Sequence, residues 1–190
     1  PPAAAAARRR GDVSVFYLCS TTAAAEIAAV APDARIIVAL RDPVAAVRAL
    51  HAQLVYNGNE RETDLANALA DEPARRRAAP APDDGYPPAV RCYRDMVRWA
   101  PQIERYIEAF GRSRVHVVRL EDLAAAPVDT FDALCRFLGV DPLPPAAARA
   151  ALRPRNTARA PRSASLHRWL HHPPPSLRRV VRMGLPGAAR

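Results

Sequence analysis

The chain has 190 residues, of which 49% are hydrophobic, so one domain with a real core is expected. Its three cysteines, Cys19, Cys92 and Cys135, are widely spaced and odd in number. They argue against a disulfide framework or a zinc site and favour a reducing, cytoplasmic location. The formal net charge of +9 is uneven, because residues 142–190 carry ten arginines and no carboxylate. A segment of one sign indicates an anionic partner, namely nucleic acid, a membrane surface or a phosphorylated ligand, or else a solvated tail.

The first ten residues, PPAAAAARRR, are a low-complexity linker or a truncated edge. Apolar residues before a basic cluster reverse the order of a signal peptide, and the run is too short to cross a membrane. The chain also opens with Pro1 instead of Met, which favours a fragment.

Apolar spacing and turn residues predict strands that alternate with helices along the chain. Thr21 or Thr22 is expected to cap the first helix, and Asn57-Gly58 and Gly139 to end later ones. The predicted strands span residues 12–20, 34–40 and 114–120, and the predicted helices span 23–31, 43–58, 62–77, 90–110 and 127–140, with a loop over 79–88 and a bend near Pro101. Such alternation predicts an α/β fold with a parallel sheet.

A permanent cation, Arg41, follows the apolar run ARIIVAL, and a helix with Pro43 in its first turn comes next. Ligands of open α/β sheets bind beyond the carboxyl ends of the strands, and a guanidinium suits phosphate. Free N–H groups at the start of the helix also favour an anion. The residues alone leave two interpretations open: a phosphate corner, or an arginine paired with Asp42 or another carboxylate.

Four segments in order carry a resemblance to a known family. They are GDVSVFYL (11–18), PDARIIVALRDPVAAVRALHAQLVYNGNE (32–60), YRDMVRWAPQIERYIEAFGRSRVHVVRLEDL (93–123) and FDALCRFLGVDP (131–142), followed by RNTARAPRSASLHRWL (155–170). Together they resemble the bacterial, single-domain sulfotransferases that use 3′-phosphoadenosine 5′-phosphosulfate (PAPS). The resemblance implies a three-layer α/β domain over residues 11–142, with a parallel sheet flanked by helices. This P-loop-like core is expected to be truncated at its N-terminus, and residues 143–190 are expected to close over the cofactor site.

The resemblance also implies site residues. Arg41 matches the family arginine that grips the 3′-phosphate of PAPS, and Ala49 stands where the family places a second, serine ligand. The C-terminal stretch implies four further cofactor contacts: Arg153, Arg155, Asn156 and Arg162. Loss of a hydrogen bond to a charged group costs roughly 1.5–3 kcal/mol, so Ala49 predicts weaker cofactor binding.

Nothing here matches the glycine-containing loop that binds the 5′-phosphosulfate in this family, and the usual base beyond that loop is also missing. Sulfuryl transfer from PAPS to a hydroxyl or amine, on a small molecule or a glycan, is therefore the first hypothesis. A catalytically incomplete nucleotide- or anion-binding remnant is the alternative. A third is nucleic-acid binding by the basic C-terminal segment, without sequence specificity. The acceptor and the oligomeric state are not predicted, and acceptor choice is assigned to residues 58–90.

Four other positions or pairs of polar residues are further site candidates. His51 is either a base on the corner helix or a packing residue, and the second interpretation is favoured. Asp12 is expected to be structural, and Glu121-Asp122 to cap the turn after the last strand. His171-His172 lacks partners at metal-ligand spacing, so no metal is expected, and no membrane span is predicted.

Overall fold

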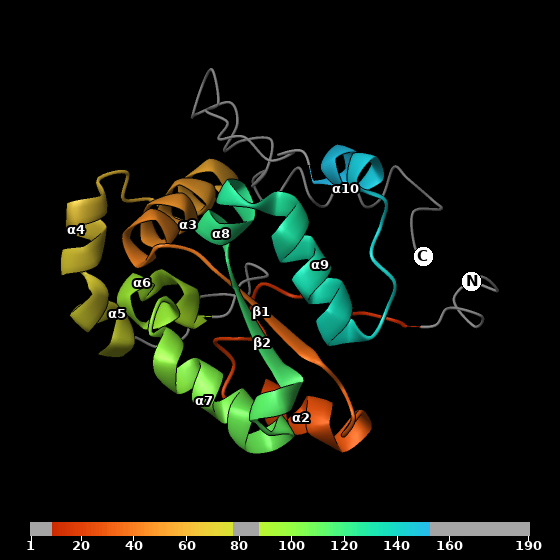
Figure 1. Ribbon diagram of the computed structural model, residues 1–190. Helices are drawn as coiled ribbons and strands as arrows, with labels where there is room; N and C mark the ends of the chain where they lie inside the picture. The colour runs from red at the N-terminus through yellow and green to blue at the C-terminus, as the bar shows by residue number, and fades with distance from the viewer. Residues whose placement is uncertain (1–8, 78–87, 153–190) are drawn as a thin grey trace, which may run out of the picture. The chain divides into compact units, whose positions relative to one another are not determined.

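The computed structural model describes residues 9–77 and 88–152 (Figure 1). The chain divides into two compact units. Unit 1 contains residues 9–46 and 94–152 of the described chain, and unit 2 contains residues 47–77 and 88–93. In these ranges no helix is long and apolar enough to cross a membrane.

A parallel pair of strands forms the centre of unit 1. Strand β1 spans Ile36–Leu40 and β2 spans Val115–Arg119, and the pairing runs from Ile36 opposite Val115 to Leu40 opposite Arg119. Figure 1 shows the two strands side by side. The prediction of a parallel sheet built from the segments 34–40 and 114–120 is confirmed. Both strands therefore end at the same edge of the sheet, where the residues that follow them meet.

Helices cover both faces of this sheet. Helices α2 (Ala23–Val30) and α7 (Trp99–Phe110) supply Ala24, Tyr106 and Phe110 to a core that includes Val38 and Val115 of the strands. On the opposite face, α9 (Pro127–Leu138) sets its Phe137 ring 5.0 Å from the His116 ring, centroid to centroid. Side chains alternate between the faces of a strand, so Val115 and His116 face different helices. Unit 1 is thus a layered α/β arrangement, which confirms the predicted fold class.

Two short helices complete the described part of unit 1. Helix α8 (Leu120–Ala125) follows β2 directly, and α10 (Pro145–Ala151) follows α9. Gly139, with φ 68°, ends α9 in the left-handed conformation. Its N–H donates to Arg136 O at 3.2 Å, and the next N–H, of Val140, donates to Cys135 O at 3.0 Å. This pair of bonds is a Schellman-type ending, as expected for glycine after a helix.

The strand predicted over residues 12–20 is wrong, because this segment forms turns. The Ser20 N–H donates to Phe16 O at 3.1 Å and to Tyr17 O at 3.2 Å, so the backbone folds on itself. Val13 and Val15, which supplied the alternating pattern, are 90% and 80% exposed. The alternation of apolar residues in this segment therefore predicted a strand where no neighbouring strand of the described residues is available to pair with it.

Side chains of α7 bind this turn segment. Arg105 Nη2 donates to Leu18 O and Ser20 O, at 3.2 Å in both cases, and the Tyr106 hydroxyl donates to Tyr17 O at 2.7 Å. Side-chain donors thus satisfy carbonyls that a strand would pair with another strand.

The prediction that Thr21 or Thr22 caps α2 is also wrong. Thr22 occupies the N-cap position without a side-chain bond, and Ser20 Oγ accepts the Ala23 N–H at 3.1 Å instead. A hydroxyl two residues earlier therefore satisfies the helix start, because the preceding turn brings Ser20 next to it.

The predicted helix over 90–110 is three short elements: a 3-10 helix over Pro88–Arg91, α6 over Tyr93–Met96, and α7. The break precedes Trp99, earlier than the bend predicted at Pro101. Pro101 lies in the first turn of α7, where its missing N–H has no intrahelical partner to lose.

In unit 2, the predicted helix over 62–77 is likewise divided, into α4 (Leu65–Ala70) and α5 (Glu72–Arg77). Asp64 caps α4 by accepting the Asn67 N–H at 2.9 Å. Pro73 stands at the second position of α5, which suits the start of a new helix.

Helix α3 (Pro43–Asn57) begins in unit 1 and continues into unit 2. It buries Val47, His51 and Leu54, which are spaced four and three residues apart and so share one face. The predicted end at Asn57-Gly58 is confirmed, and Gly58 has a φ of 78°.

Candidate anion-binding site

The candidate site lies where β1 ends and α3 begins, in unit 1. Arg41 and Asp42 are the two residues between Leu40 and Pro43. Asp42 caps the helix: its Oδ1 accepts the Ala45 N–H at 2.8 Å, and its carbonyl accepts the Ala46 N–H at 2.8 Å. The backbone direction at this corner is therefore fixed by Asp42.

The start of α3 is less open to an anion than the sequence predicted. Pro43 has no N–H, and the N–H groups of Ala45 and Ala46 both donate to Asp42. The Asp42 carboxylate also places a negative charge at the helix end, where a ligand anion would otherwise be stabilised. An anion that binds here would therefore depend more on a side chain than on the N–H groups of Ala45 and Ala46.

The Arg41 guanidinium is such a group. Arg41 is exposed, and among residues 9–77 and 88–152 no carboxylate or carbonyl pairs with it. The alternative in which Asp42 or another carboxylate neutralises Arg41 has no support in this part of the chain. A guanidinium has five N–H donors and a permanent charge, so Arg41 is available to bind phosphate or a carboxylate.

A carboxylate from the other strand also binds the corner. Glu121 Oε1 accepts the Asp42 N–H at 2.9 Å, across a separation of 79 residues. This hydrogen bond lowers the pKa of Glu121, and Arg119, whose Nε lies 3.7 Å from Glu121 Oε2, acts in the same direction. The predicted capping role is wrong, since Glu121 and Asp122 lie inside the first turn of α8, which has no side-chain cap. In the sequence, the feature that could have indicated the contact of Glu121 with Asp42 is the acidic pair Glu121-Asp122 just after the second strand.

A comparison with known protein families gives a match over most of the chain. The profile of the sulfotransferase family matches residues 7–145. The chain belongs to the sulfotransferase family. It is also similar to the crystal structure of a sulfotransferase from Alicyclobacillus acidocaldarius, with 32% sequence identity and a TM-score of 0.58. The match covers 73% of this chain and 56% of that one, so the chain spans little more than half the length of this solved relative. No curated protein matches the chain significantly.

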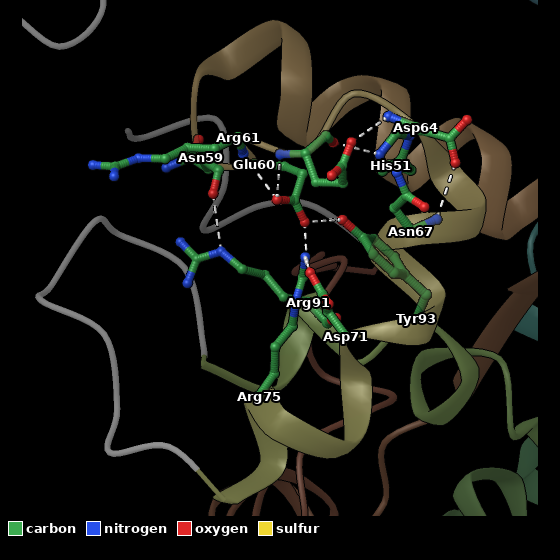
Figure 2. Close-up of polar contacts among 11 residues, drawn as sticks. His51, Asn59, Glu60, Arg61, Asp64, Asn67, Asp71, Arg75, Arg91 and Tyr93 are labelled. Carbon is green, nitrogen blue, oxygen red and sulfur yellow. Dashed lines mark hydrogen bonds and ion pairs between the residues drawn. The ribbon is translucent and has the colours of Figure 1, made fainter.

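His51 does not have the surroundings of a free base. It is 6% exposed, its Nε2 lies 2.9 Å from Glu62 O, and its ring meets the Tyr93 ring edge-on at 5.6 Å between centroids. Figure 2 shows His51 among the polar contacts of unit 2. The packing interpretation is therefore supported over the catalytic one.

The other site residues predicted from sequence lie in several parts of the chain. Asp12 accepts a hydrogen bond from the Tyr17 hydroxyl at 2.5 Å, in line with the structural role expected for it. Ala49 is exposed on α3, and its effect on cofactor binding stays a prediction. The residues outside the described ranges are Arg153, Arg155, Asn156, Arg162 and the pair His171-His172. Within those ranges, no three His, Cys, Asp or Glu side chains gather as a metal-binding group.

Proposed function

We propose that the protein transfers a sulfuryl group from PAPS to a hydroxyl or amine of a small molecule or glycan. In this proposal Arg41 binds the 3′-phosphate of the donor. The observation that carries it is the unpaired, exposed Arg41 guanidinium at the carboxyl end of β1 in a chain of the sulfotransferase family.

Arg41 has both the charge and the position that suit a phosphate ligand. Ligands of parallel α/β sheets lie beyond the carboxyl ends of the strands, and Arg41 directly follows such an end. A phosphate oxygen pair can accept two parallel N–H bonds from one guanidinium, which gives both affinity and orientation. Because Asp42 already caps α3, Arg41 is the group at this corner that distinguishes a ligand with a 3′-phosphate from one without it.

In the proposed reaction the acceptor oxygen or nitrogen attacks sulfur in line with the departing 5′-phosphate oxygen. A base takes the acceptor proton, and cations stabilise the charge on the leaving adenosine 3′,5′-bisphosphate. The base is not assigned to any residue of the described ranges. Binding without turnover is the second candidate function, and the engagement of His51 by Glu62 O favours it for this stretch of chain.

Arg153, Arg155, Asn156 and Arg162 complete the proposed donor site through the resemblance of residues 155–170 to the family. Their contribution is expected on the same 3′-phosphate side.

Calorimetric titration with two nucleotides tests the proposal. The full chain should bind adenosine 3′,5′-bisphosphate more tightly than adenosine 5′-phosphate, and Arg41→Ala should remove most of that preference. A charge-assisted hydrogen bond contributes roughly 1.5–3 kcal/mol, so a loss of about tenfold or more is expected for the bisphosphate. Arg136→Ala is the matched control, because Arg136 is another exposed arginine of unit 1 whose guanidinium has no partner in the described residues.

Equal losses for both nucleotides in Arg41→Ala would remove the assignment of the 3′-phosphate to this residue. An equal loss in Arg136→Ala would show that only the net charge matters.

A further inference from the structure

We propose that Glu121 is a positioning residue for Arg41, and that it acts through the backbone that joins Arg41 to Asp42. This inference rests on the proposed function, since it assigns the group that orients the phosphate-binding arginine. Its basis is the 2.9 Å hydrogen bond from the Asp42 N–H to Glu121 Oε1.

The Asp42 N–H belongs to the peptide group whose carbonyl belongs to Arg41. Because a peptide group is planar, an acceptor that fixes the N–H direction also fixes the rotation about the Cα–C bond of Arg41. This peptide group lies one residue beyond β1, and Glu121 holds it from the segment that follows β2. The angle between the Arg41 side chain and the start of α3 therefore depends on a residue after β2.

The rest of Asp42 is held as well. Its side chain accepts the Ala45 N–H at 2.8 Å and its carbonyl accepts the Ala46 N–H at 2.8 Å. The Glu121 contact adds a third hydrogen bond, so Asp42 is bonded through its N–H, its carbonyl and its carboxylate. The corner is then a rigid base from which a freely accessible guanidinium projects, as preorganised binding requires.

The charge of Glu121 works against the ligand. A carboxylate close to a bound phosphate repels it, and the lowered pKa of Glu121 keeps that carboxylate ionised at neutral pH. Its value to the site therefore lies in its acceptor oxygen and not in its negative charge. Arg119, with its Nε 3.7 Å from Glu121 Oε2, offsets part of the repulsion.

Two substitutions separate the acceptor from the charge. Glu121→Gln and Glu121→Ala both remove the negative charge and the pairing with Arg119, but only glutamine keeps an oxygen that can accept the Asp42 N–H. The Glu121→Gln variant should bind adenosine 3′,5′-bisphosphate as tightly as the unsubstituted chain or more tightly. The Glu121→Ala variant should bind it roughly two- to tenfold more weakly than Glu121→Gln does, the range for loss of one hydrogen bond.

Adenosine 5′-phosphate serves as the second ligand, and neither substitution should change its affinity by much. Asp122→Ala is the matched control, because Asp122 is an exposed carboxylate in the same turn whose side chain has no partner in the described residues. In an Arg41→Ala background the alanine and glutamine variants should become equal, since the group that Glu121 positions is gone.

A readout without ligand comes from the Asp42 amide resonance in a pH titration by NMR. It should shift with the ionisation of Glu121, and the part of the shift that comes from Glu121 should be absent in Glu121→Gln, which leaves only the part that comes from the Asp42 carboxylate.

The outcomes separate this inference from the proposed function. If the unsubstituted chain shows no preference for the bisphosphate, the proposed function fails and the positioning role fails with it. The preference could instead exist and depend on Arg41 while Glu121→Ala and Glu121→Gln bind the bisphosphate equally. That result would overturn the positioning role of Glu121 and leave the proposed function in place. If the two variants still differ in the Arg41→Ala background, Glu121 acts on the ligand by another route, and the inference is likewise overturned.

Discussion

The Tyr93 hydroxyl donates a hydrogen bond to Glu60 Oε2 at 2.7 Å and joins two residues of unit 2 that are 33 positions apart. Tyr93 is 0% exposed and Glu60 is 5% exposed. Arg75 Nη1 approaches the same oxygen to 2.5 Å, and Glu60 Oε1 accepts the N–H groups of Arg61 and Glu62 at 2.8 and 3.0 Å (Figure 2). One buried carboxylate thus connects the end of α3, helix α5 and the start of α6.

Tyr93→Phe should lower the free energy of unfolding by roughly 1.5–3 kcal/mol, because it removes a buried hydrogen bond to a charged acceptor. Thermal and urea unfolding followed by circular dichroism would measure the change. Tyr106→Phe is the control, since Tyr106 is also buried but its hydroxyl donates to the neutral carbonyl of Tyr17. That substitution should cost about 1 kcal/mol, within the range for a neutral bond. Equal costs would mean that the charge of Glu60 adds nothing to the Tyr93 bond.

The stability of the protein should fall at acidic pH in part through Glu60. Burial disfavours its ionised form, but hydrogen bonds from Arg75, the Glu62 N–H and Tyr93 outweigh burial and lower its pKa. A lowered carboxyl pKa stabilises the fold above the unfolded value of about 4.3, and this contribution is lost as the pH falls through the folded pKa.

Glu60→Gln tests this pH dependence. The variant should be less stable at pH 7, because the amide places a donor near Arg75 and Tyr93. Its free energy of unfolding should also depend less on pH below about 4.3, by up to about 1.4 kcal/mol per pH unit. Urea unfolding at a series of pH values gives the slope, and parallel slopes for the two proteins would contradict the assignment to Glu60.

Gly139→Ala should destabilise the protein by about 1–2 kcal/mol, because Gly139 has a φ of 68°, which an alanine adopts at a cost. Space is not the reason, since an added Cβ would meet its nearest atoms, from Arg9 and Arg35, at 3.5 and 3.6 Å. Gly11→Ala is the control: Gly11 has no positive φ, and its added Cβ would have no atom within 4 Å. Chemical unfolding of both variants should show a loss for position 139 alone.

The basic C-terminal segment should respond to salt according to its ligand. A nucleotide contacts a few arginines, so the affinity for adenosine 3′,5′-bisphosphate should fall mildly as salt rises. Duplex DNA releases many counterions, with a logarithmic slope of about −0.9 per phosphate neutralised, so any DNA binding should be weak and steeply salt-dependent. Fluorescence anisotropy at several salt concentrations measures both, and tight binding of one DNA sequence at physiological salt would contradict the assignment of this segment to a nucleotide.

Strands β1 and β2 were predicted from sequence, whereas the strand over residues 12–20 is wrong because side chains of α7 take the place of a neighbouring strand. The helices predicted over 62–77 and 90–110 are each divided, at points that apolar spacing did not mark. Continuous apolar runs placed β1 and β2, since a strand covered on both faces needs apolar residues throughout. Residues 12–20 had a strand pattern but no strand beside them, and donors from α7 satisfied their carbonyls instead. The spacing of apolar residues carries no information about such hydrogen bonds, because they depend on which side chain from a distant part of the sequence packs against the segment.

The same reason explains the parts of the site that sequence reasoning missed. Arg41 was found from its place after an apolar run, which is a local signal. Glu121 contacts the site across a separation of 79 residues, and no spacing rule links it to Asp42. The same holds for the structural contact of Glu60 with Tyr93 in unit 2, across 33 residues. The role of Asp42 as a helix cap was within reach, since Asp before Pro at a helix start is a familiar capping sequence.

The contact between Asp42 and Glu121 also has a consequence for biosynthesis. A ribosome adds about 5–20 residues per second, so the 79 residues between these partners take roughly 4–16 s to synthesise. Over that interval Asp42 has been synthesised while its acceptor, and the β2 strand that pairs with β1, are not yet complete. The nascent chain therefore carries an apolar segment, Ile36–Leu40, without its neighbouring strand for several seconds. The corner formed by Arg41 and Asp42 is completed only when synthesis has passed the second strand.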